Sequence, residues 1–334
     1  MTIPLCCCTG GHYTSVGGGK YNVAAGYATV VGGGALNTAN GHYSSVNSGY
    51  QNNAYGYGST IVGGHYNVAG SSDNLTAAVG SYAFVGSGYS NLAKGHYTSV
   101  VAGRSNMAMG HYASVAAGYL NKAHGYAATV SGGMNNEAGT MDLLNAAYST
   151  VAGGIGNSCF GHYTTVSGGY YNDATGYSTF VGGGAANTAK GHYSSVHAGV
   201  NNNAFGYGAT IAGGNRNQVG SIYDDDVTNI TYSSGAYGFV GSGAYNTAEG
   251  HYTSVIGGYV NGATGYMSSV QGGQYNSARG HYTSIDGGWQ NTAAGYACTI
   301  AGGVYNTAKG HYSNVQSGYN NKAFGYGSTI AGGY

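Results

Sequence analysis

The chain has 334 residues, with nine Lys and Arg against nine Asp and Glu, so its formal net charge is zero. This balance gives no support to a basic groove for nucleic acid, and no apolar run is long enough to indicate a membrane-spanning helix. Glycine (67) and tyrosine (36) are abundant, whereas charged residues make up 5%. We therefore expect an uncharged, tyrosine-rich surface that favours lateral packing into a trimer, bundle or lattice.

Residues 1–10 precede the regular part of the chain and contain three adjacent cysteines, Cys6, Cys7 and Cys8. Adjacent cysteines rarely bond to one another because the resulting ring is strained, and zinc needs about four ligands at turn spacing. Two interpretations stay open: disulfides between subunits, or a reduced, disordered N-terminal segment. The segment lacks the basic start and long apolar core of a secretion signal.

A 15-residue repeat begins at Gly11 and continues to Tyr334, with extra residues at 71–79, 140–145 and 221–234. We number its positions from the first Gly of each copy. Position 6 is Val or Ile and position 9 is Gly in all 20 copies, and position 12 is Asn in all 19 copies that reach it. Position 14 is usually Ala, although Cys159 occupies it once. A fixed period of this kind is the signature of a repeat architecture.

Positions 2 to 6 alternate in the pattern of a short strand with positions 4 and 6 on one face. Gly at 8 and 9 and Asn at 12 suggest residues that tolerate positive φ on either side of a bend. A second strand ending in Ala would return the chain one layer up, ~4.8 Å along the stack. The pattern predicts an all-β fold: one parallel β-solenoid of 20 coils over residues 11–334, with no helix.

Two columns of this solenoid are expected to hold it together. The core column at position 6 is represented by Val16, Val31, Val46 and Ile61. The Asn column would form a ladder of side-chain amides, each able to bond the next; it includes Asn22, Asn37, Asn52, Asn67, Asn172, Asn187, Asn202 and Asn217. Cys159 and Cys298 fall in core columns and are expected to be inert small hydrophobes.

The pattern Ser-x-Val-x-Gly-Gly-x-x-Asn-x-Ala-x-Gly resembles the head repeats of YadA-like trimeric autotransporter adhesins, over residues 11–334. This resemblance implies a β-roll with a left-handed turn, and an adhesin function as a trimer. Those adhesins also carry a secretion signal, a coiled-coil stalk and a membrane anchor, none of which is visible in this chain.

The extra segments are the irregular part of the repeat, and irregular loops on a rigid scaffold usually carry recognition. Candidate recognition residues are Asp73, Asn74, Asp224, Asp225, Asp226 and Asn229. The Asp cluster could bind calcium, although a solvated loop tip is the simpler interpretation. Asn74 and Asn229 begin glycosylation sequons.

Nine histidines stand at position 2, mostly in alternate coils, which would place them ~9.6 Å apart, too far for a shared zinc. We interpret them as structural or surface residues. The sequence shows no catalytic constellation apart from the repeat, so neither an enzyme nor a cofactor is expected. The histidines are His12, His42, His96, His111, His162, His192, His251, His281 and His311.

The first functional hypothesis is a structural subunit of a self-assembling extracellular fibre, on a cell, spore or virion surface. Its copies would stack head-to-tail through open coil ends, with Cys6 to Cys8 locking the joint, and would also pack laterally. The alternative is an adhesin or receptor-binding fibre head that contacts a host receptor or glycan. Ice binding is considered because position 5 is mostly Ser or Thr. It is a minor alternative because Phe84, Phe180 and Phe239 interrupt this column.

Overall fold

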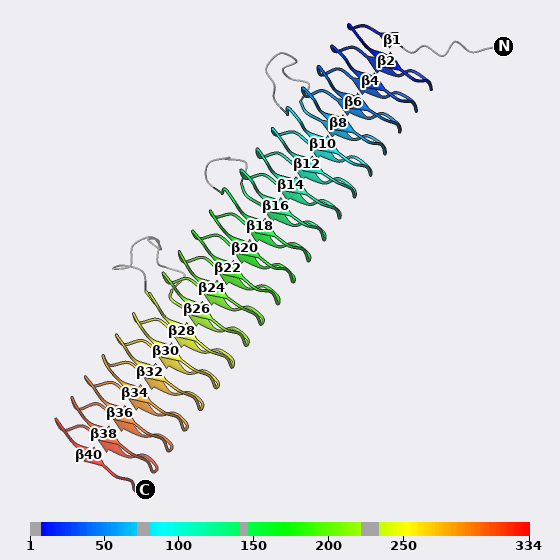
Figure 1. Cartoon of the computed structure of the whole chain (residues 1–334). Coiled ribbons are helices and arrows are strands. Elements are labelled where there is room, and N and C mark those ends of the chain that lie inside the picture. The colour runs from blue at the N-terminus through cyan, green and yellow to red at the C-terminus, as the bar shows by residue number, and fades with distance from the viewer. Residues whose placement is uncertain (1–7, 72–79, 141–145, 222–233) are drawn as a thin grey trace. The chain divides into compact units, whose positions relative to one another are not determined.

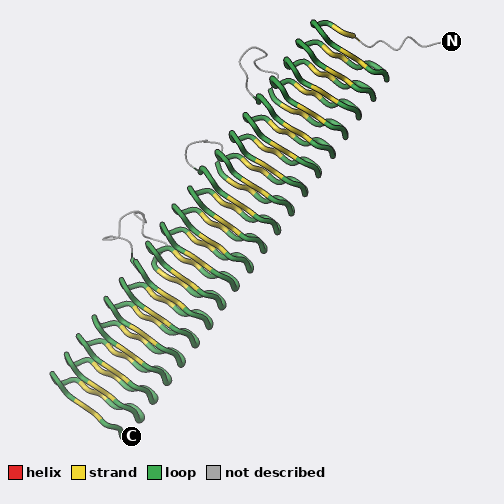
Figure 2. The backbone as a smooth tube through the Cα atoms, viewed as in Figure 1, coloured by secondary structure: helices red, strands yellow, loops and turns green. Residues whose placement is uncertain are grey.

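The computed structural model describes residues 8–71, 80–140, 146–221 and 234–334. The chain divides into two compact units, Met1–Tyr163 and Thr164–Tyr334. Both are parallel β-solenoids with a 15-residue period, and the described residues contain no helix. Each coil has two strands of two residues, joined by turns (Figures 1 and 2). The prediction of an all-β parallel solenoid is confirmed.

Even-numbered strands occupy positions 5 and 6, and odd-numbered strands occupy positions 13 and 14. In the first unit the even-numbered strands are β2 (Ser15–Val16), β4 (Val30–Val31), β6 (Ser45–Val46), β8 (Thr60–Ile61), β10 (Phe84–Val85), β12 (Ser99–Val100), β14 (Ser114–Val115), β16 (Thr129–Val130) and β18 (Thr150–Val151). Its odd-numbered strands are β1 (Cys8–Thr9), β3 (Val23–Ala24), β5 (Thr38–Ala39), β7 (Asn53–Ala54), β9 (Val68–Ala69), β11 (Leu92–Ala93), β13 (Met107–Ala108), β15 (Lys122–Ala123), β17 (Glu137–Ala138) and β19 (Ser158–Cys159).

The second unit repeats this arrangement. Its even-numbered strands are β20 (Thr165–Val166), β22 (Phe180–Val181), β24 (Ser195–Val196), β26 (Thr210–Ile211), β28 (Phe239–Val240), β30 (Ser254–Val255), β32 (Ser269–Val270), β34 (Ser284–Ile285), β36 (Thr299–Ile300), β38 (Asn314–Val315) and β40 (Thr329–Ile330). Its odd-numbered strands are β21 (Asp173–Ala174), β23 (Thr188–Ala189), β25 (Asn203–Ala204), β27 (Gln218–Val219), β29 (Thr247–Ala248), β31 (Gly262–Ala263), β33 (Ser277–Ala278), β35 (Thr292–Ala293), β37 (Thr307–Ala308) and β39 (Lys322–Ala323).

Within each unit, a strand pairs in parallel with the equivalent strand of the next coil, so identical columns lie in register. Val46 pairs with Ile61, 15 residues on. The register also holds across the extra segments, because Thr60 pairs with Phe84 and Thr210 pairs with Phe239. The insertions therefore leave the stack of coils continuous within each unit.

The odd-numbered sheet begins earlier than the predicted solenoid. Cys8 pairs with Val23 and Thr9 with Ala24, so the last residues of the N-terminal segment occupy the strand columns of the preceding coil. Parallel pairing needs only backbone groups, which is why this strand forms without the Gly and Asn signature of the repeat.

The core is a thin layer between the two strands of each coil. Val31, Val46 and Ile61 at position 6 are fully buried, as are the Ala residues at position 14. Val16, in the first coil of the repeat, is only half-buried. Small residues at position 4 fill the remaining space; Thr98 Oγ1, for example, donates to the Gly95 carbonyl at 2.8 Å. Because Ala and small hydroxyls leave so little room, each coil is flat.

The Asn column bonds the backbone more than it bonds itself. Asn276 Oδ1 accepts from the backbone N–H of Asn291, and Asn276 Nδ2 donates to the carbonyls of Gly272 and Gly288. Direct amide-to-amide bonds occur at few steps, such as Asn52 Nδ2 to Asn37 Oδ1 at 3.2 Å. The column thus joins each coil to the next through backbone N–H and C=O groups at the bend.

The bends reach positive φ at one of the predicted positions and at two that were not predicted. Position 9 Gly does so, as at Gly288 (φ 93°), where a Cβ would lie 2.1 Å from the carbonyl oxygen of the next coil. The Asn at position 12 does not; the left-handed residues are instead at positions 3 and 11, for example Tyr43 (φ 58°) and Gln290 (φ 54°). The expectation for Asn was wrong because its buried amide is fixed by hydrogen bonds one residue beyond the bend.

Candidate functional site

Each coil presents two edges and two broad faces. We call the turn at positions 1–3 edge 1 and the turn at positions 9–11 edge 2. The even face carries the outward side chains of the even-numbered strands, and the odd face carries those of the odd-numbered strands. These four surfaces contain the candidate binding groups.

Edge 1 carries an uninterrupted row of tyrosine rings in each unit, which we call the tyrosine row. Consecutive ring centroids are 5.0–5.8 Å apart in the first unit and 5.2–5.9 Å apart in the second. The first row is Tyr13, Tyr27, Tyr43, Tyr57, Tyr82, Tyr97, Tyr112, Tyr126, Tyr148 and Tyr163. The second is Tyr177, Tyr193, Tyr207, Tyr237, Tyr252, Tyr266, Tyr282, Tyr296, Tyr312 and Tyr326.

Tyrosines from two positions of the repeat contribute to the tyrosine row. Where position 2 is not Tyr, the ring comes from position 3, as at Tyr43. Where position 2 is Tyr, as at Tyr27, position 3 holds another residue, commonly Ala or Gly. Every copy of the repeat has one Tyr at either position 2 or position 3. This rule is present in the sequence, but its meaning depends on positions 2 and 3 sharing one edge.

The rings of the tyrosine row are partly exposed and influence one another. Tyr43 is 52% exposed and Tyr27 is 37% exposed. Desolvation, followed by repulsion from the neighbouring Tyr43 and Tyr82, raises the pKa of Tyr57. The row presents phenol hydroxyls and ring edges to solvent.

The histidines at position 2 complete the hydrogen bonds of edge 1. The backbone N–H of Tyr27 donates to His42 Nδ1 at 2.9 Å, and the N–H of Tyr296 donates to His311 Nδ1 at 3.3 Å. An accepting Nδ1 requires the unprotonated form at that nitrogen. His96 and His111 stack with centroids 4.7 Å apart, and burial together with the charge of His111 lowers the pKa of His96.

Edge 2 is also aromatic, but its row has gaps. In the second unit the Tyr259 ring contacts the rings of Tyr245 and Tyr275, with centroids 5.7 and 5.6 Å away. The Arg216 guanidinium lies 5.4 Å from the Tyr245 ring centroid and hydrogen-bonds the Tyr245 hydroxyl. Such cation–π contacts fix aromatic side chains on a surface.

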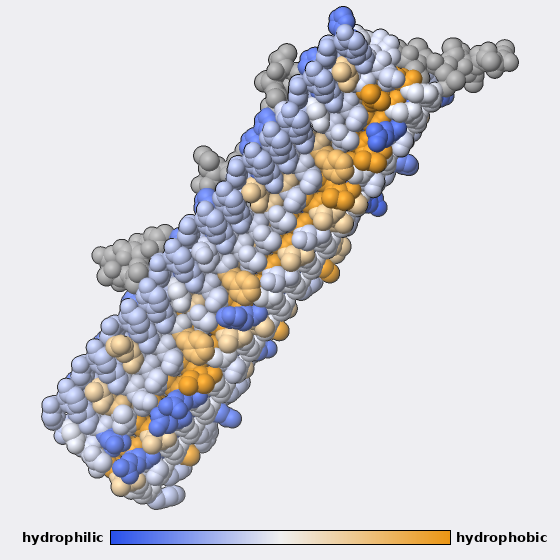
Figure 3. Space-filling model, in the orientation of Figure 1, coloured by the Kyte–Doolittle hydropathy of each residue, from blue (hydrophilic) through white to orange (hydrophobic). Residues whose placement is uncertain are grey.

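The even face is mixed. Hydroxyl contacts such as Ser45 Oγ to Thr60 Oγ1, at 3.3 Å, alternate with apolar side chains. Val101 and Ile256 are 50% and 52% exposed, and the Phe84 ring lies over Gly86, 3.5 Å from where a Cβ would be. Figure 3 shows apolar side chains running as a stripe along the face that it presents.

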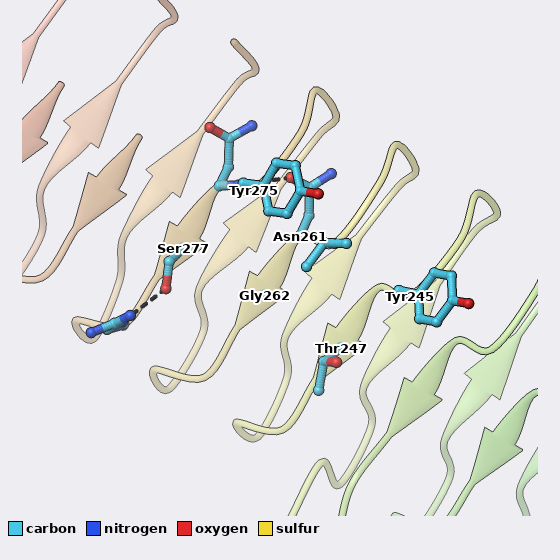
Figure 4. A pocket seen from close by; sticks show the side chains of 9 residues that line it. Tyr245, Thr247, Asn261, Gly262, Tyr275 and Ser277 are labelled. Carbon is cyan, nitrogen blue, oxygen red and sulfur yellow. Dashed lines mark hydrogen bonds between the residues drawn. The ribbon is translucent and has the colours of Figure 1, made fainter. Parts of the chain in front are cut away.

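The odd face has a hollow in the second unit, which we call the notch. Its volume is about 290 Å³. Thr247, Gly262 and Ser277 form its floor at position 13 of three successive coils, and Tyr245 and Tyr275 stand at one end (Figure 4). Arg279 also lines it, with Nε donating to Ser277 Oγ at 2.8 Å.

Two ionisable groups with little exposure lie on or beside the odd faces: Asp173 in β21 is half-buried, and His124, directly after β15, is buried. Burial raises the pKa of Asp173 to about 6, and its Oδ1 has no hydrogen-bond partner among the described residues. His124 is 1% exposed, and neither ring nitrogen is hydrogen-bonded within the described ranges. Burial, which outweighs the opposing charge of Glu137, lowers the pKa of His124.

Several sequence-predicted site residues fall outside this description. Cys6 and Cys7, and the candidate recognition residues Asp73, Asn74, Asp224, Asp225, Asp226 and Asn229, lie outside the described residues. Cys8 is in β1. Cys159 and Cys298 are buried thiols that are not in a disulfide. In the described parts of the chain, no three or more His, Cys, Asp or Glu side chains are grouped as a metal site.

The chain was compared with protein-family models and with curated proteins. No family model matches the chain, and no curated protein matches it significantly. The resemblance to adhesin head repeats therefore rests on the repeat pattern itself. Among the residues that the structure describes, no helix has the length and apolarity that crossing a bilayer requires.

Proposed function

We propose that this protein is a structural subunit of a self-assembling fibre or appendage at an extracellular or surface location, and that its copies associate laterally through edge 1. The observation that supports this proposal is the uninterrupted tyrosine row. Tyrosine is enriched at protein interfaces because its ring offers apolar area and its hydroxyl offers a hydrogen bond.

The spacing of the row favours a second copy as the partner. Rings recur once per coil, ~4.8 Å apart along the stack. A second solenoid has the same ring spacing, so the rings of two copies can pack against each other along the whole contact. Contacts between neighbouring rings already restrict the side chains, so little rotamer freedom is lost on association. With 5% charged residues, there is little long-range repulsion to keep copies apart.

The test is an assembly assay on a variant with a shortened row. Four consecutive ring positions in the second unit are changed to Ser: Tyr252, Tyr266, Tyr282 and Tyr296. The matched control changes the position 5 hydroxyl residues of the same coils to Ala: Ser254, Ser269, Ser284 and Thr299. Sedimentation velocity and negative-stain microscopy measure assembly, and circular dichroism measures whether each variant is folded.

We expect the wild type and the control to form bundles, and the folded Tyr variant to need at least tenfold more protein to do so, which is about 1.4 kcal/mol. Bundling of the folded Tyr variant at the wild-type concentration would refute edge 1 as the contact. A wild type that stays monomeric at all accessible concentrations would refute self-assembly itself.

Head-to-tail stacking locked by Cys6, Cys7 and Cys8 stays a separate prediction, and the same microscopy with reductant tests it. Filaments that shorten on reduction would support the disulfide joint, whereas filaments unchanged by reductant would contradict it. The adhesin alternative placed recognition on loops that lie outside the described residues, so it too stays a prediction.

A further inference from the structure

The notch on the odd face exists because one column lacks a side chain in one coil. Position 13 points outward from the odd-numbered strands, and Gly262 in β31 occupies it between Thr247 in β29 and Ser277 in β33. A Cβ at Gly262 would meet no atom within 4 Å. The hollow is thus about two strand spacings wide, ~9.6 Å, and is open to solvent. Figure 4 shows Gly262 between Thr247 and Ser277.

The aromatic end of the notch is held in place before any ligand arrives. Tyr245 and Tyr275 both contact Tyr259, which lies between them on edge 2. Arg216 fixes Tyr245 from the other side by its cation–π contact and hydrogen bond. Ring positions that are fixed in advance lower the entropy cost of binding.

The polar end of the notch is cationic. The side chain of Arg279 makes one hydrogen bond within the described residues, from Nε to Ser277 Oγ, which orients the guanidinium and leaves its terminal nitrogens for a ligand. No Asp or Glu is among the lining residues. A guanidinium held in this way suits a bidentate pair with a planar carboxylate, or with a sulfate.

We propose that the notch binds an acidic monosaccharide unit, a pyranose that carries a carboxylate or sulfate. Its apolar ring face would pack on Tyr245 or Tyr275, its hydroxyls would bond Thr247 and Ser277, and its acid group would pair with Arg279. The volume of about 290 Å³ is at the lower limit of small-molecule sites, which fits one sugar ring rather than a larger ligand. This inference is independent of edge 1 and goes beyond assembly.

The first unit contains a natural contrast. In three successive coils that also follow an insertion, the same outward column holds Leu92, Met107 and Lys122, which pair in register. Met107 therefore stands where Gly262 stands in the second unit, and the column tolerates a long side chain. Gly262→Met is accordingly a variant that fills the notch without disturbing the strand.

The experiment is ligand-observed saturation-transfer NMR on the full chain, with three probes: methyl glucuronide, methyl glucoside 6-sulfate and neutral methyl glucoside. Methyl glucuronide has about 14 heavy atoms, which at ordinary ligand efficiency gives a Kd on the order of 1 mM. We expect at least one acidic probe to bind in this range and the neutral glucoside to bind at least fivefold more weakly. Whichever acidic probe binds more tightly identifies the acid group.

Three variants locate the binding. Gly262→Met should weaken it at least tenfold, and Arg279→Gln should remove the preference for the acidic probe over the neutral one. Thr307→Met, in the same column at β37, is the control and should bind as the wild type does. The proposal is overturned if no acidic probe binds at about 20 mM (twentyfold above the Kd expected from ligand efficiency), if the neutral glucoside binds equally well, or if folded Gly262→Met and Arg279→Gln both retain wild-type binding.

Discussion

Removing one amide from the Asn column should destabilise the second unit far more than removing its outward neighbour. Asn291 Nδ2 donates to the carbonyls of Gly287 and Gly303, and its Oδ1 accepts from the backbone N–H of Asn306, all at 2.9 Å. Asn291→Ala loses two donated bonds at about 1 kcal/mol each and leaves a buried N–H unpaired at about 2 kcal/mol. We expect the free energy of unfolding to fall by about 4 kcal/mol.

Urea unfolding followed by fluorescence of Trp289, the only tryptophan, measures this loss in the affected region. The control is Thr292→Ala. The Thr292 side chain points outward and is not part of the Asn column, so its removal should lower the free energy of unfolding by at most about 0.5 kcal/mol. Hydrogen exchange gives a second readout, because the Asn306 amide should lose its protection in Asn291→Ala. Equal stability of the two variants, with Asn306 still protected, would refute the view that the amide column joins the coils.

Three further predictions concern single side chains. Gly288→Ala should abolish cooperative unfolding of its region, because a Cβ there would overlap a carbonyl of the next coil. At Gly302 a Cβ would meet no atom within 4 Å, so Gly302→Ala should leave the free energy of unfolding nearly unchanged in the same urea titration. Asp173 favours its protonated form in the fold, so its contribution to stability is greatest below pH 4 and is lost as the pH rises through about 6. Asp173→Asn should therefore restore up to about 3 kcal/mol at pH 8 and nothing at pH 4, and an equal gain at both would contradict this. The pKa of His124 is lowered in the fold, so the contribution of the neutral ring to stability is lost as the pH falls below about 6.5. His124→Phe should therefore raise the urea midpoint at pH 5 more than at pH 8, and a pH-independent change would contradict this. A buried ring is tolerated at the matching position before the 221–234 insertion, where Phe205 stands.

The sequence was sufficient for the fold because the period and the two apolar columns leave few alternatives. Val or Ile every 15 residues, with Ala eight positions later, can be buried together only if equivalent residues stack. The insertions also followed from the sequence, since the repeat resumes in phase after each of them, and Thr60 does pair with Phe84.

The side-chain roles were harder to predict, because periodicity gives a residue's column and not its hydrogen bonds. An Asn column is equally consistent with amides that bond one another and with amides that bond backbone, and only the bend geometry decides. The same limit hid the left-handed conformation of Gln290, a residue type with no preference for it. The notch was missed because Gly262 is one glycine among 67, and its significance lies in pointing outward between two larger neighbours.

The Asn column also gives the stack a direction of growth. In each coil the amide accepts from the N–H of the following coil and donates to a carbonyl of that coil, as Asn276 does toward Asn291 and Gly288. A coil at the growing end therefore holds unsatisfied groups that only its successor can complete. As the chain emerges from the ribosome in the N-to-C direction, each new 15 residues would find a ready template, so folding can keep pace with synthesis without waiting for distant contacts.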